Sequence, residues 1–281
     1  MRISITWCGT ACVILDFGNY RILLDPFFER NPKSMPLLPL KKEEVQKIDA
    51  ILVSHGHFDH ITSAPYFLHR DRCRVLGNAQ VKINIERIGS GKLLPELPDC
   101  IDKGDLNNID IVNPDIVYSL RKNGETLATV TPIQSCHIQF DVHEINRVAF
   151  NWEVWSHAGR FLSYWIGLPK GKVLGYEIKY QGKRIIIFGS LNFKKLDTFE
   201  KYRPCDLLFI PLAGRNDVTN PGIRVTRYFQ PKIVIPSHYD NFFPPISQWT
   251  DISKYKVRVK QEMPDTQVIM PDIGIPRVVD L

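Results

Sequence analysis

The chain has 281 residues, of which 44% are hydrophobic and 23% are charged, and its formal net charge is +6. These values are ordinary for a soluble globular protein with room for one large domain or two small ones. The positive charge is mild and spread along the chain. Because Lys and Arg form no block with interleaved aromatic residues, nucleic acid is not indicated as a partner.

The N-terminus and the cysteines bear on the compartment. Residues 2–7 alternate polar and apolar side chains, a strand pattern rather than a secretory signal. No apolar run approaches the roughly 18 residues needed to span a bilayer. The six cysteines include no Cys-x-x-Cys pair and are interpreted as free thiols. We therefore expect a cytoplasmic protein without a membrane segment.

Apolar segments bounded by turn residues predict strands and helices in both halves of the chain. Gly18-Asn19 and Gln181-Gly182 are typical of tight hairpin turns. With no clear linker, the pattern predicts one domain, 1–281, of α/β or α+β class. The predicted strands are Ile3–Trp7, Cys12–Phe17, Tyr20–Leu24, Ala50–Val53, Arg74–Gly77, Leu127–Thr131, Val173–Tyr180, Arg184–Phe188, Leu207–Ile210, Lys232–Ile235 and Gln267–Met270. The predicted helices are Glu43–Lys47, Ala64–His69, Val81–Ile88 and Lys194–Lys201.

Four potential metal ligands follow the predicted strand Ala50–Val53, within the run Ser-His-Gly-His-Phe-Asp-His. Imidazole nitrogens and carboxylate oxygens bind zinc and similar transition metals. His55 and His57 lie two residues apart, so at an extended strand end they project to the same side and can bind one ion together. Asp59 and His60 follow at a turn and can face a second ion. The run predicts a metal site.

The pattern His-x-His-x-Asp-His after a buried strand resembles the signature of the metallo-β-lactamase-fold hydrolases. The resemblance implies an α+β fold, a four-layer αββα sandwich of two packed mixed sheets with helices outside. It also implies a third histidine for the first ion, which matches His137, with His143 and His157 as rivals. A last histidine is expected after a C-terminal strand. His238, within Pro-Ser-His-Tyr, is similar to the family's closing motif, especially in its sugar-lactonase-like and uncharacterised branches, and would join Asp59 and His60.

The chain departs from the family pattern at one position. Ser190 follows Gly189 where many members of the family carry an aspartate that bridges two ions. A neutral hydroxyl is a poor bridge, so three outcomes stay open: two ions bridged only by hydroxide, one ion bound tightly and one weakly, or a fold without catalysis. The resemblance places Asp25 as a support of the metal-binding loop, with a simple turn role as the alternative. Tyr239 is either a hydrogen-bond donor to an oxyanion or a packed core residue.

The resemblance implies a metal-dependent hydrolase with one or two zinc ions, manganese or iron being possible, and Asp59 orienting the nucleophile and accepting its proton. We expect a small-molecule carbonyl substrate, a lactone, ester or amide. A phosphodiesterase of the same fold and a catalytically impaired metal-binding scaffold are the alternatives. The segment at about 140–170, rich in Trp and His, is predicted to be either aromatic core or a cap lining the substrate site. The sequence leaves the oligomeric state open.

Overall fold

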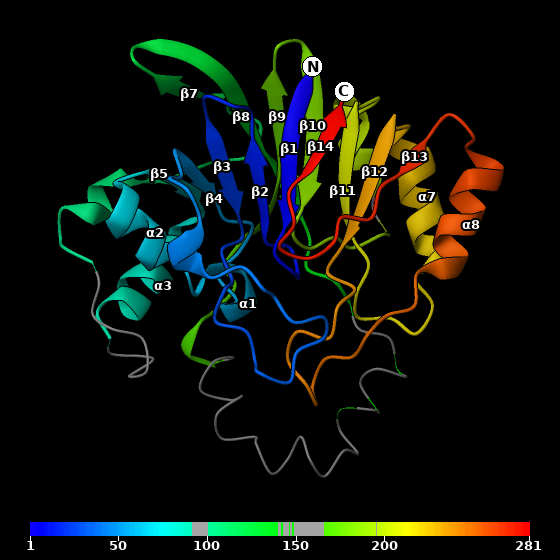
Figure 1. Ribbon diagram of the computed structural model, residues 1–281, viewed down its shortest axis with the longest axis horizontal. Coiled ribbons are helices and arrows are strands. Elements are labelled where there is room, and N and C mark those ends of the chain that lie inside the picture. Colours follow the sequence, from blue (N-terminus) through cyan, green and yellow to red (C-terminus); the bar gives the residue numbers. More distant parts are fainter. Residues whose placement is uncertain (92–100, 140–141, 143–145, 147, 149–165, 195) are drawn as a thin grey trace.

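Two seven-stranded β-sheets face each other in the computed structural model, which describes residues 1–91, 101–139, 142, 146, 148, 166–194 and 196–281 (Figure 1). The first sheet has the order β14-β1-β2-β3-β4-β5-β6 and the second the order β13-β12-β11-β10-β9-β8-β7. The first comprises β1 (Arg2–Trp7), β2 (Val13–Asp16), β3 (Arg21–Leu24), β4 (Ala50–Leu52), β5 (Arg74–Gly77), β6 (Ile109–Ile111) and β14 (Arg277–Asp280). The second comprises β7 (Tyr118–Lys122), β8 (Glu125–Ser135), β9 (Val173–Tyr180), β10 (Lys183–Phe188), β11 (Leu207–Pro211), β12 (Ile233–Ser237) and β13 (Gln267–Val268).

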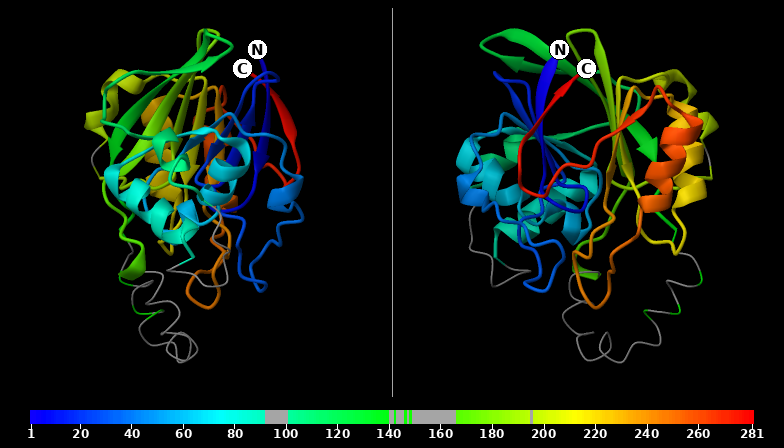
Figure 2. Two further views of the ribbon diagram at one scale, coloured as in Figure 1. Left: turned by 90° about the vertical axis from the view of Figure 1, so that its left-hand side faces the viewer. Right: turned by 45° about the vertical axis from the view of Figure 1, so that its right-hand side comes forward.

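Helices cover the outer face of each sheet, as the views in Figure 2 show. On the side of the first sheet lie α1 (Phe58–Ile61), α2 (Ala64–Asp71) and α3 (Ala79–Gly89). On the side of the second lie α7 (Thr219–Phe229) and α8 (Ser253–Glu262). Both sheets are mixed: β3 to β6 and β10 to β13 pair in parallel, whereas the other neighbours are antiparallel. The predicted four-layer α+β sandwich is confirmed.

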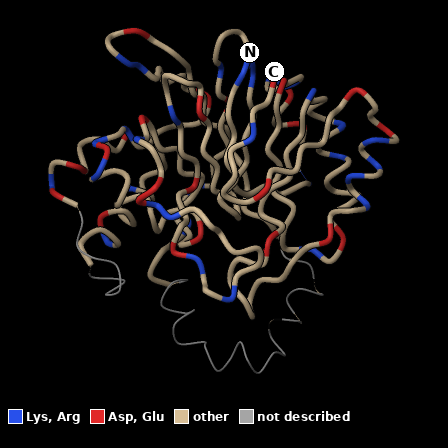
Figure 3. The backbone as a smooth tube through the Cα atoms, viewed as in Figure 1, with Lys and Arg blue, Asp and Glu red and all other residues tan. Residues whose placement is uncertain are grey.

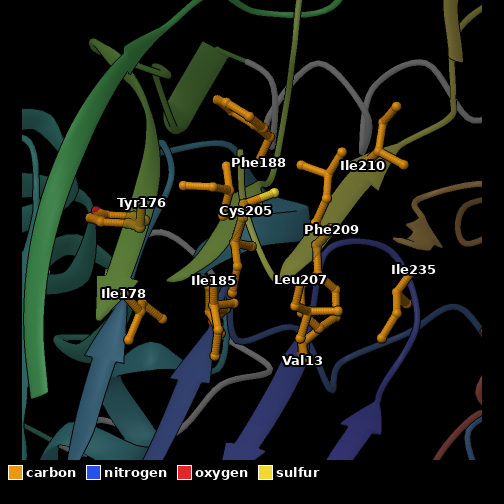
Figure 4. Close-up of a cluster of buried hydrophobic side chains, with 14 of the residues drawn as sticks. Val13, Tyr176, Ile178, Ile185, Phe188, Cys205, Leu207, Phe209, Ile210 and Ile235 are labelled. Atoms are coloured by element: carbon orange, nitrogen blue, oxygen red, sulfur yellow. The ribbon is translucent and has the colours of Figure 1, made fainter. Parts of the chain in front are cut away.

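The apolar runs form strands because both faces of the central strands are buried. Along β3, Ile22 and Leu24 face the core between the two sheets, and Leu23 faces the helices. Side chains of a strand alternate between its faces, so an uninterrupted apolar run packs against the other sheet on one face and against the helices on the other. Figure 4 shows the core between the sheets, where Val13 of β2 belongs to the same buried cluster as Ile185 and Leu207 of the second sheet.

Turn chemistry sets the predicted hairpins. Gln181 and Gly182 join β9 to β10 with φ angles of 48° and 75°, the positive pair that a type I′ hairpin turn requires. Gly18, at φ 87°, closes the β2–β3 hairpin, where Phe17 N–H donates to the Tyr20 carbonyl at 3.0 Å. Both hairpins are therefore confirmed.

Some boundaries differ from the sequence prediction. The helices predicted at Glu43–Lys47 and Lys194–Lys201 are short 3₁₀ turns, η1 (Lys42–Glu44) and η3 (Asp197–Tyr202), and a further one, η2 (Asp105–Asn108), precedes β6. The sequence analysis also missed β14, which pairs with β1 and brings the two ends of the chain together (Figure 1). Three of its four residues are exposed, so its composition carries little apolar signal.

Charged residues are dispersed over the molecule. Figure 3 shows Lys and Arg interleaved with Asp and Glu along most of the described chain, with a basic run on α8. Within the described ranges, no helix combines the length and the apolar character needed to cross a membrane. Most of the segment predicted at about 140–170 as aromatic core or cap lies outside the described residues.

Candidate metal centre

The carboxyl ends of several strands meet at one edge of the sandwich, the lower edge in Figure 1. The run His55–His60 follows β4 and continues into α1, whose N-cap is His57. His137 follows β8 of the second sheet, and His238 directly follows β12. Because parallel strands of a sheet end at the same edge, residues from distant parts of the sequence arrive side by side.

The first ligand group consists of His55, His57 and His137. One ligand atom from each lies within 4.8 Å of the others. The His55 and His57 rings have centroids 4.7 Å apart, and the His137 ring lies 5.1 Å and 4.8 Å from them. His55 Nε2 approaches His57 Nδ1 to 3.1 Å. Three imidazoles converging in this way are the ligand set of an open catalytic zinc site.

The second ligand group consists of Asp59, His60 and His238, whose ligand atoms likewise lie within 4.8 Å of one another. The Oδ2 atom of Asp59 lies 3.4 Å from Nε2 of His60 and 3.4 Å from Nε2 of His238. The His55 and His60 rings are only 4.0 Å apart. The two groups therefore adjoin, and the structure brings together all six residues that the sequence analysis named as ligands.

Burial keeps the first group neutral. It lowers the pKa of His57 to about 3 and that of His137 to about 4. Burial, reinforced by His60 and His57, holds the pKa of His55 well below its usual range. Neutral imidazole is the form that binds a metal ion, so this group needs no deprotonation at pH 7.

The second group carries opposite charges. Burial by itself lowers the pKa of His60, but the carboxylates of Asp59 and Asp25 outweigh it and raise that pKa to about 10. Burial by itself raises the pKa of Asp59, but His60 and His238 hold it well below its usual range. Without a metal ion, His60 is a cation and Asp59 an anion at neutral pH. An ion bound here takes the place of the His60 proton.

Asp25 and Ser54 orient the histidines from behind. His60 Nδ1 lies 2.8 Å from Asp25 Oδ2, which leaves His60 Nε2 to face Asp59. Ser54 donates its N–H to Asp25 Oδ1 at 2.6 Å and its hydroxyl to Oδ2 at 2.7 Å, and that hydroxyl also lies 3.0 Å from His55 Nδ1. Such outer hydrogen bonds fix the tautomer and direction of a metal-binding imidazole. Ser54 precedes the motif directly, and the sequence analysis gave it no role.

Close backbone approach completes this support. At Gly189, which follows β10, an added Cβ would lie 2.8 Å from Ser54 Cβ and closer still to Ser54 Oγ and Asp25 Oδ2. Asp25 itself has a φ of 42°, in the left-handed region that residues other than glycine rarely adopt. The Asp25–Ser54 pair is therefore held tightly, between β4 and the end of β10.

Ser190 supports the loop that carries His137. Its hydroxyl accepts the N–H of Ile138 at 2.9 Å, and its carbonyl accepts the Ser135 hydroxyl at 2.8 Å. His137 Nδ1 lies 2.9 Å from the Ile138 carbonyl, which directs Nε2 towards the first group. The serine thus occupies a buried supporting position, with its hydroxyl engaged by the backbone.

Two asparagines that the sequence analysis missed support the turn between the first two histidines, Asn84 by direct contact and Asn78 through the neighbouring segment 170–172. Asn84 on α3 donates its side-chain amide to the Gly56 carbonyl at 2.8 Å and to the Pro169 carbonyl at 2.9 Å. Asn78 donates to the carbonyl of Lys172 at 2.5 Å. Gly56 N–H donates in turn to the Lys170 carbonyl at 2.9 Å. No motif in the sequence marks these residues, because their role depends on contacts with a distant segment.

Tyr239 lies in the core. It is 4% exposed, its ring stacks on Trp7 with centroids 5.0 Å apart, and Trp249 meets it edge-on at 5.2 Å. Burial raises the pKa of its hydroxyl. These contacts are those of the packed alternative. His143 and His157, the rivals of His137, lie outside the described residues.

The residues present fit one or two metal ions. Their donors are five imidazoles and one carboxylate, a set suited to zinc and also to iron or manganese. His238 Nδ1 is buried and finds no hydrogen-bond partner among the described residues. The nitrogen of His238 that faces the second group is Nε2, 3.4 Å from Asp59 Oδ2. The two ligand groups together define a candidate metal centre.

Comparison with known proteins shows the family of the chain. Residues 20–239 match the family described as the Beta-lactamase superfamily domain, and the chain belongs to that superfamily. A UPF0173 metal-dependent hydrolase of Staphylococcus aureus strain MRSA252 is 25% identical over 272 residues, covering 95% of this chain and 97% of the relative.

Two solved structures share the fold. Igni18, a metallo hydrolase of the archaeon Ignicoccus hospitalis, aligns over 100% of both chains with a TM-score of 0.69 and 16% identity. CmlA, a diiron β-hydroxylase of Streptomyces venezuelae, aligns over 99% of this chain and 54% of its own, with a TM-score of 0.61 and 12% identity. At these identities the likeness concerns the fold. One fold here holds both a hydrolase and an iron enzyme, so the fold alone does not select the metal.

Proposed function

We propose that the protein is a metal-dependent hydrolase whose centre is formed by the two ligand groups, with zinc as the metal. The observation that carries this proposal is the convergence of His55, His57 and His137 beside Asp59, His60 and His238. The metal-dependent hydrolase from Staphylococcus aureus, which aligns over nearly the whole chain, supports it. When bound, an ion of this kind lowers the pKa of its water towards about 7 and polarises a substrate oxygen.

The chain's own residues supply positioning and charge. The first group presents three neutral imidazoles at pH 7, so it binds an ion without losing protons. Asp59 stays anionic at neutral pH because its pKa is held low. A carboxylate with a low pKa is a weak base. We therefore assign Asp59 to holding an ion and accepting a hydrogen bond from the attacking water, and propose proton acceptance only as a secondary role.

Ser190 bears on the substrate. The six residues of the two groups include a single carboxylate, Asp59, and the Ser190 hydroxyl is engaged by the Ile138 N–H. A pair of ions without a carboxylate bridge is a weaker clamp for both oxygens of a phosphodiester. This favours a small-molecule carbonyl substrate, a lactone, ester or amide. A phosphodiester substrate is the second candidate, because the same paired groups also suit an in-line displacement at phosphorus.

The first experiment measures metal content per chain by elemental analysis, after purification without chelator and again after reconstitution with zinc, manganese or iron(II). The reconstituted protein is then assayed against lactones, esters, amides and phosphodiesters. His57→Ala is the test variant, and Lys256→Ala, at an exposed position of α8 outside both ligand groups, is the control.

We expect about two ions per chain, hydrolysis of a carbonyl substrate, and its loss in His57→Ala alone. One ion per chain would indicate that only one group binds tightly. Metal binding without turnover on any panel substrate would favour the impaired scaffold. No bound metal after reconstitution would overturn the proposal.

A further inference from the structure

Two loops are joined beside the second ligand group. One follows Asp25 at the end of β3, and the other follows His238 at the end of β12. Met35 of the first loop and Asn241 of the second form an antiparallel backbone bridge, with N–H to carbonyl distances of 2.8 Å and 2.9 Å in the two directions. The two loops are therefore hydrogen-bonded to each other beside the centre.

A buried ion pair links the same two loops. Arg30 Nη2 lies 2.8 Å from Asp240 Oδ2, and the two side chains are only 4% and 0% exposed. If one of these two buried charges were removed, the other would be left without a partner and would strongly destabilise the fold. Arg30 Nε and Nη1 find no hydrogen-bond partner among the described residues, and Gly9 is the residue against which Nη1 packs. Arg30 Nη2 also donates to the Pro36 carbonyl at 3.4 Å, so the guanidinium is held by one carboxylate, one carbonyl and close packing.

The pair reaches His238 through the backbone of Thr10. Asp240 Oδ1 accepts the Thr10 N–H at 2.9 Å, and the Thr10 carbonyl accepts the His238 N–H at 2.9 Å. His238 has a φ of 58° and Thr10 one of 47°. Residues with a Cβ seldom adopt this left-handed region, and they persist there only where surrounding contacts enforce it. Asp240 is placed to enforce it at both residues.

We propose that Arg30 and Asp240 form a clamp that holds His238 in place and so sets the metal affinity of the second ligand group. Both are positioning residues, since neither belongs to a ligand group. This inference rests on the proposed metal centre. The clamp is specific to the second group: its first loop begins at Asp25, which orients His60, and its second begins at His238. The first group has supports of its own, namely Asn84 and Ser190.

The test separates the two ions. Metal-free protein is titrated with zinc in competition with a chromophoric chelator, which yields a dissociation constant for each ion. His137→Ala and His238→Ala assign the two constants to the two groups. The test variant is the double substitution Arg30→Met with Asp240→Asn, which removes both charges and leaves an amide oxygen to accept the Thr10 N–H. Arg30→Lys retains the charge. Arg227→Met, which breaks an exposed ion pair with Glu262 on the helices, is the matched control.

We expect the double substitution to lower the affinity for the second ion by about tenfold or more, as is typical for residues that support a metal ligand. The affinity for the first ion should change by less than about threefold. The single variant Arg30→Lys should bind the second ion nearly as tightly as the wild type, because it retains the charge. Arg227→Met should bind both ions as the wild type does. If circular dichroism shows that the double variant does not fold, Arg30→Gln with Asp240→Asn, which also removes both charges but keeps a hydrogen-bonding pair at the two positions, replaces it under the same criteria.

Two results overturn the clamp alone. In the first, the wild type binds two ions and the double variant has the same dissociation constants. In the second, both dissociation constants of the double variant rise equally, as a general loosening of the fold would produce. A wild-type protein that binds no zinc overturns the proposed centre, and the clamp with it.

Discussion

Gly189→Ala tests the support behind the second ligand group most directly. The added Cβ would fall well inside 3.0 Å of both Asp25 Oδ2 and Ser54 Oγ, and 2.8 Å from Ser54 Cβ, whereas real Cβ contacts essentially never come within 3.0 Å. Asp25 cannot retreat without losing its bonds to His60, at 2.8 Å, and to the Ser54 hydroxyl, at 2.7 Å. The substitution must therefore break the hydrogen bonds that direct His60.

The magnitude follows from those bonds. A hydrogen bond to a charged group contributes roughly 1.5–3 kcal/mol, and an overpacked buried site costs roughly 1–3 kcal/mol. These effects overlap, because moving the carboxylate relieves the clash, so we expect the free energy of unfolding to fall by about 2–4 kcal/mol. The affinity for the second ion should fall by about 10- to 100-fold, as for other changes behind a metal ligand.

Urea unfolding of the metal-free protein, followed by circular dichroism, measures the first quantity, and chelator competition measures the second. Gly104→Ala is the matched control, because nothing lies within 4 Å of its added Cβ and its φ of −65° suits alanine. If Gly189→Ala matched Gly104→Ala in both measurements, Asp25 and Ser54 would not be packed as described, and the reasoning would be refuted.

Three further predictions follow from the same contacts. Because Asp59 and Asp25 raise the pKa of His60 to about 10, a proton competes with the second ion below that pH, and the affinity for the second ion should rise about tenfold per pH unit between pH 6 and 9. The affinity for the first ion should stay flat, because its ligands His57 and His137 have pKa values of about 3 and 4. Chelator competition across this range measures both affinities, and equal slopes would contradict the assignment. Asp25→Asn should lower the His60 pKa by removing one of the two carboxylates that raise it. NMR titration of the metal-free protein would show this as a move of the protonation midpoint to lower pH, and an unmoved midpoint would leave Asp25 without its role. Asn84→Ala leaves the carbonyls of Gly56 and Pro169 without this donor and should cost about 2–4 kcal/mol in urea unfolding, against a change near zero for Asn220→Ala on the surface of α7.

Local patterns were sufficient for most of the strands and for four of the six ligands of the centre. Strand and hairpin positions follow from apolar runs and turn residues, because backbone periodicity and the φ angles of a turn are fixed by neighbouring residues. The ligands within His55–His60 could be predicted for the same reason: they lie in one short run after one strand. His137 and His238 needed the family resemblance, since nothing in their own surroundings pairs them with that run.

What the sequence by itself determined is therefore local: which segments form strands, where two hairpins turn, and which run carries metal ligands. Only the tertiary structure decided what lies across from these residues. It placed β14 beside β1, Ser54 and Gly189 behind Asp25, Asn84 against the His55–His57 turn, and Arg30 against Asp240. These contacts join residues far apart in the chain, and their partners are selected by the packing of two whole sheets, which no local periodicity encodes.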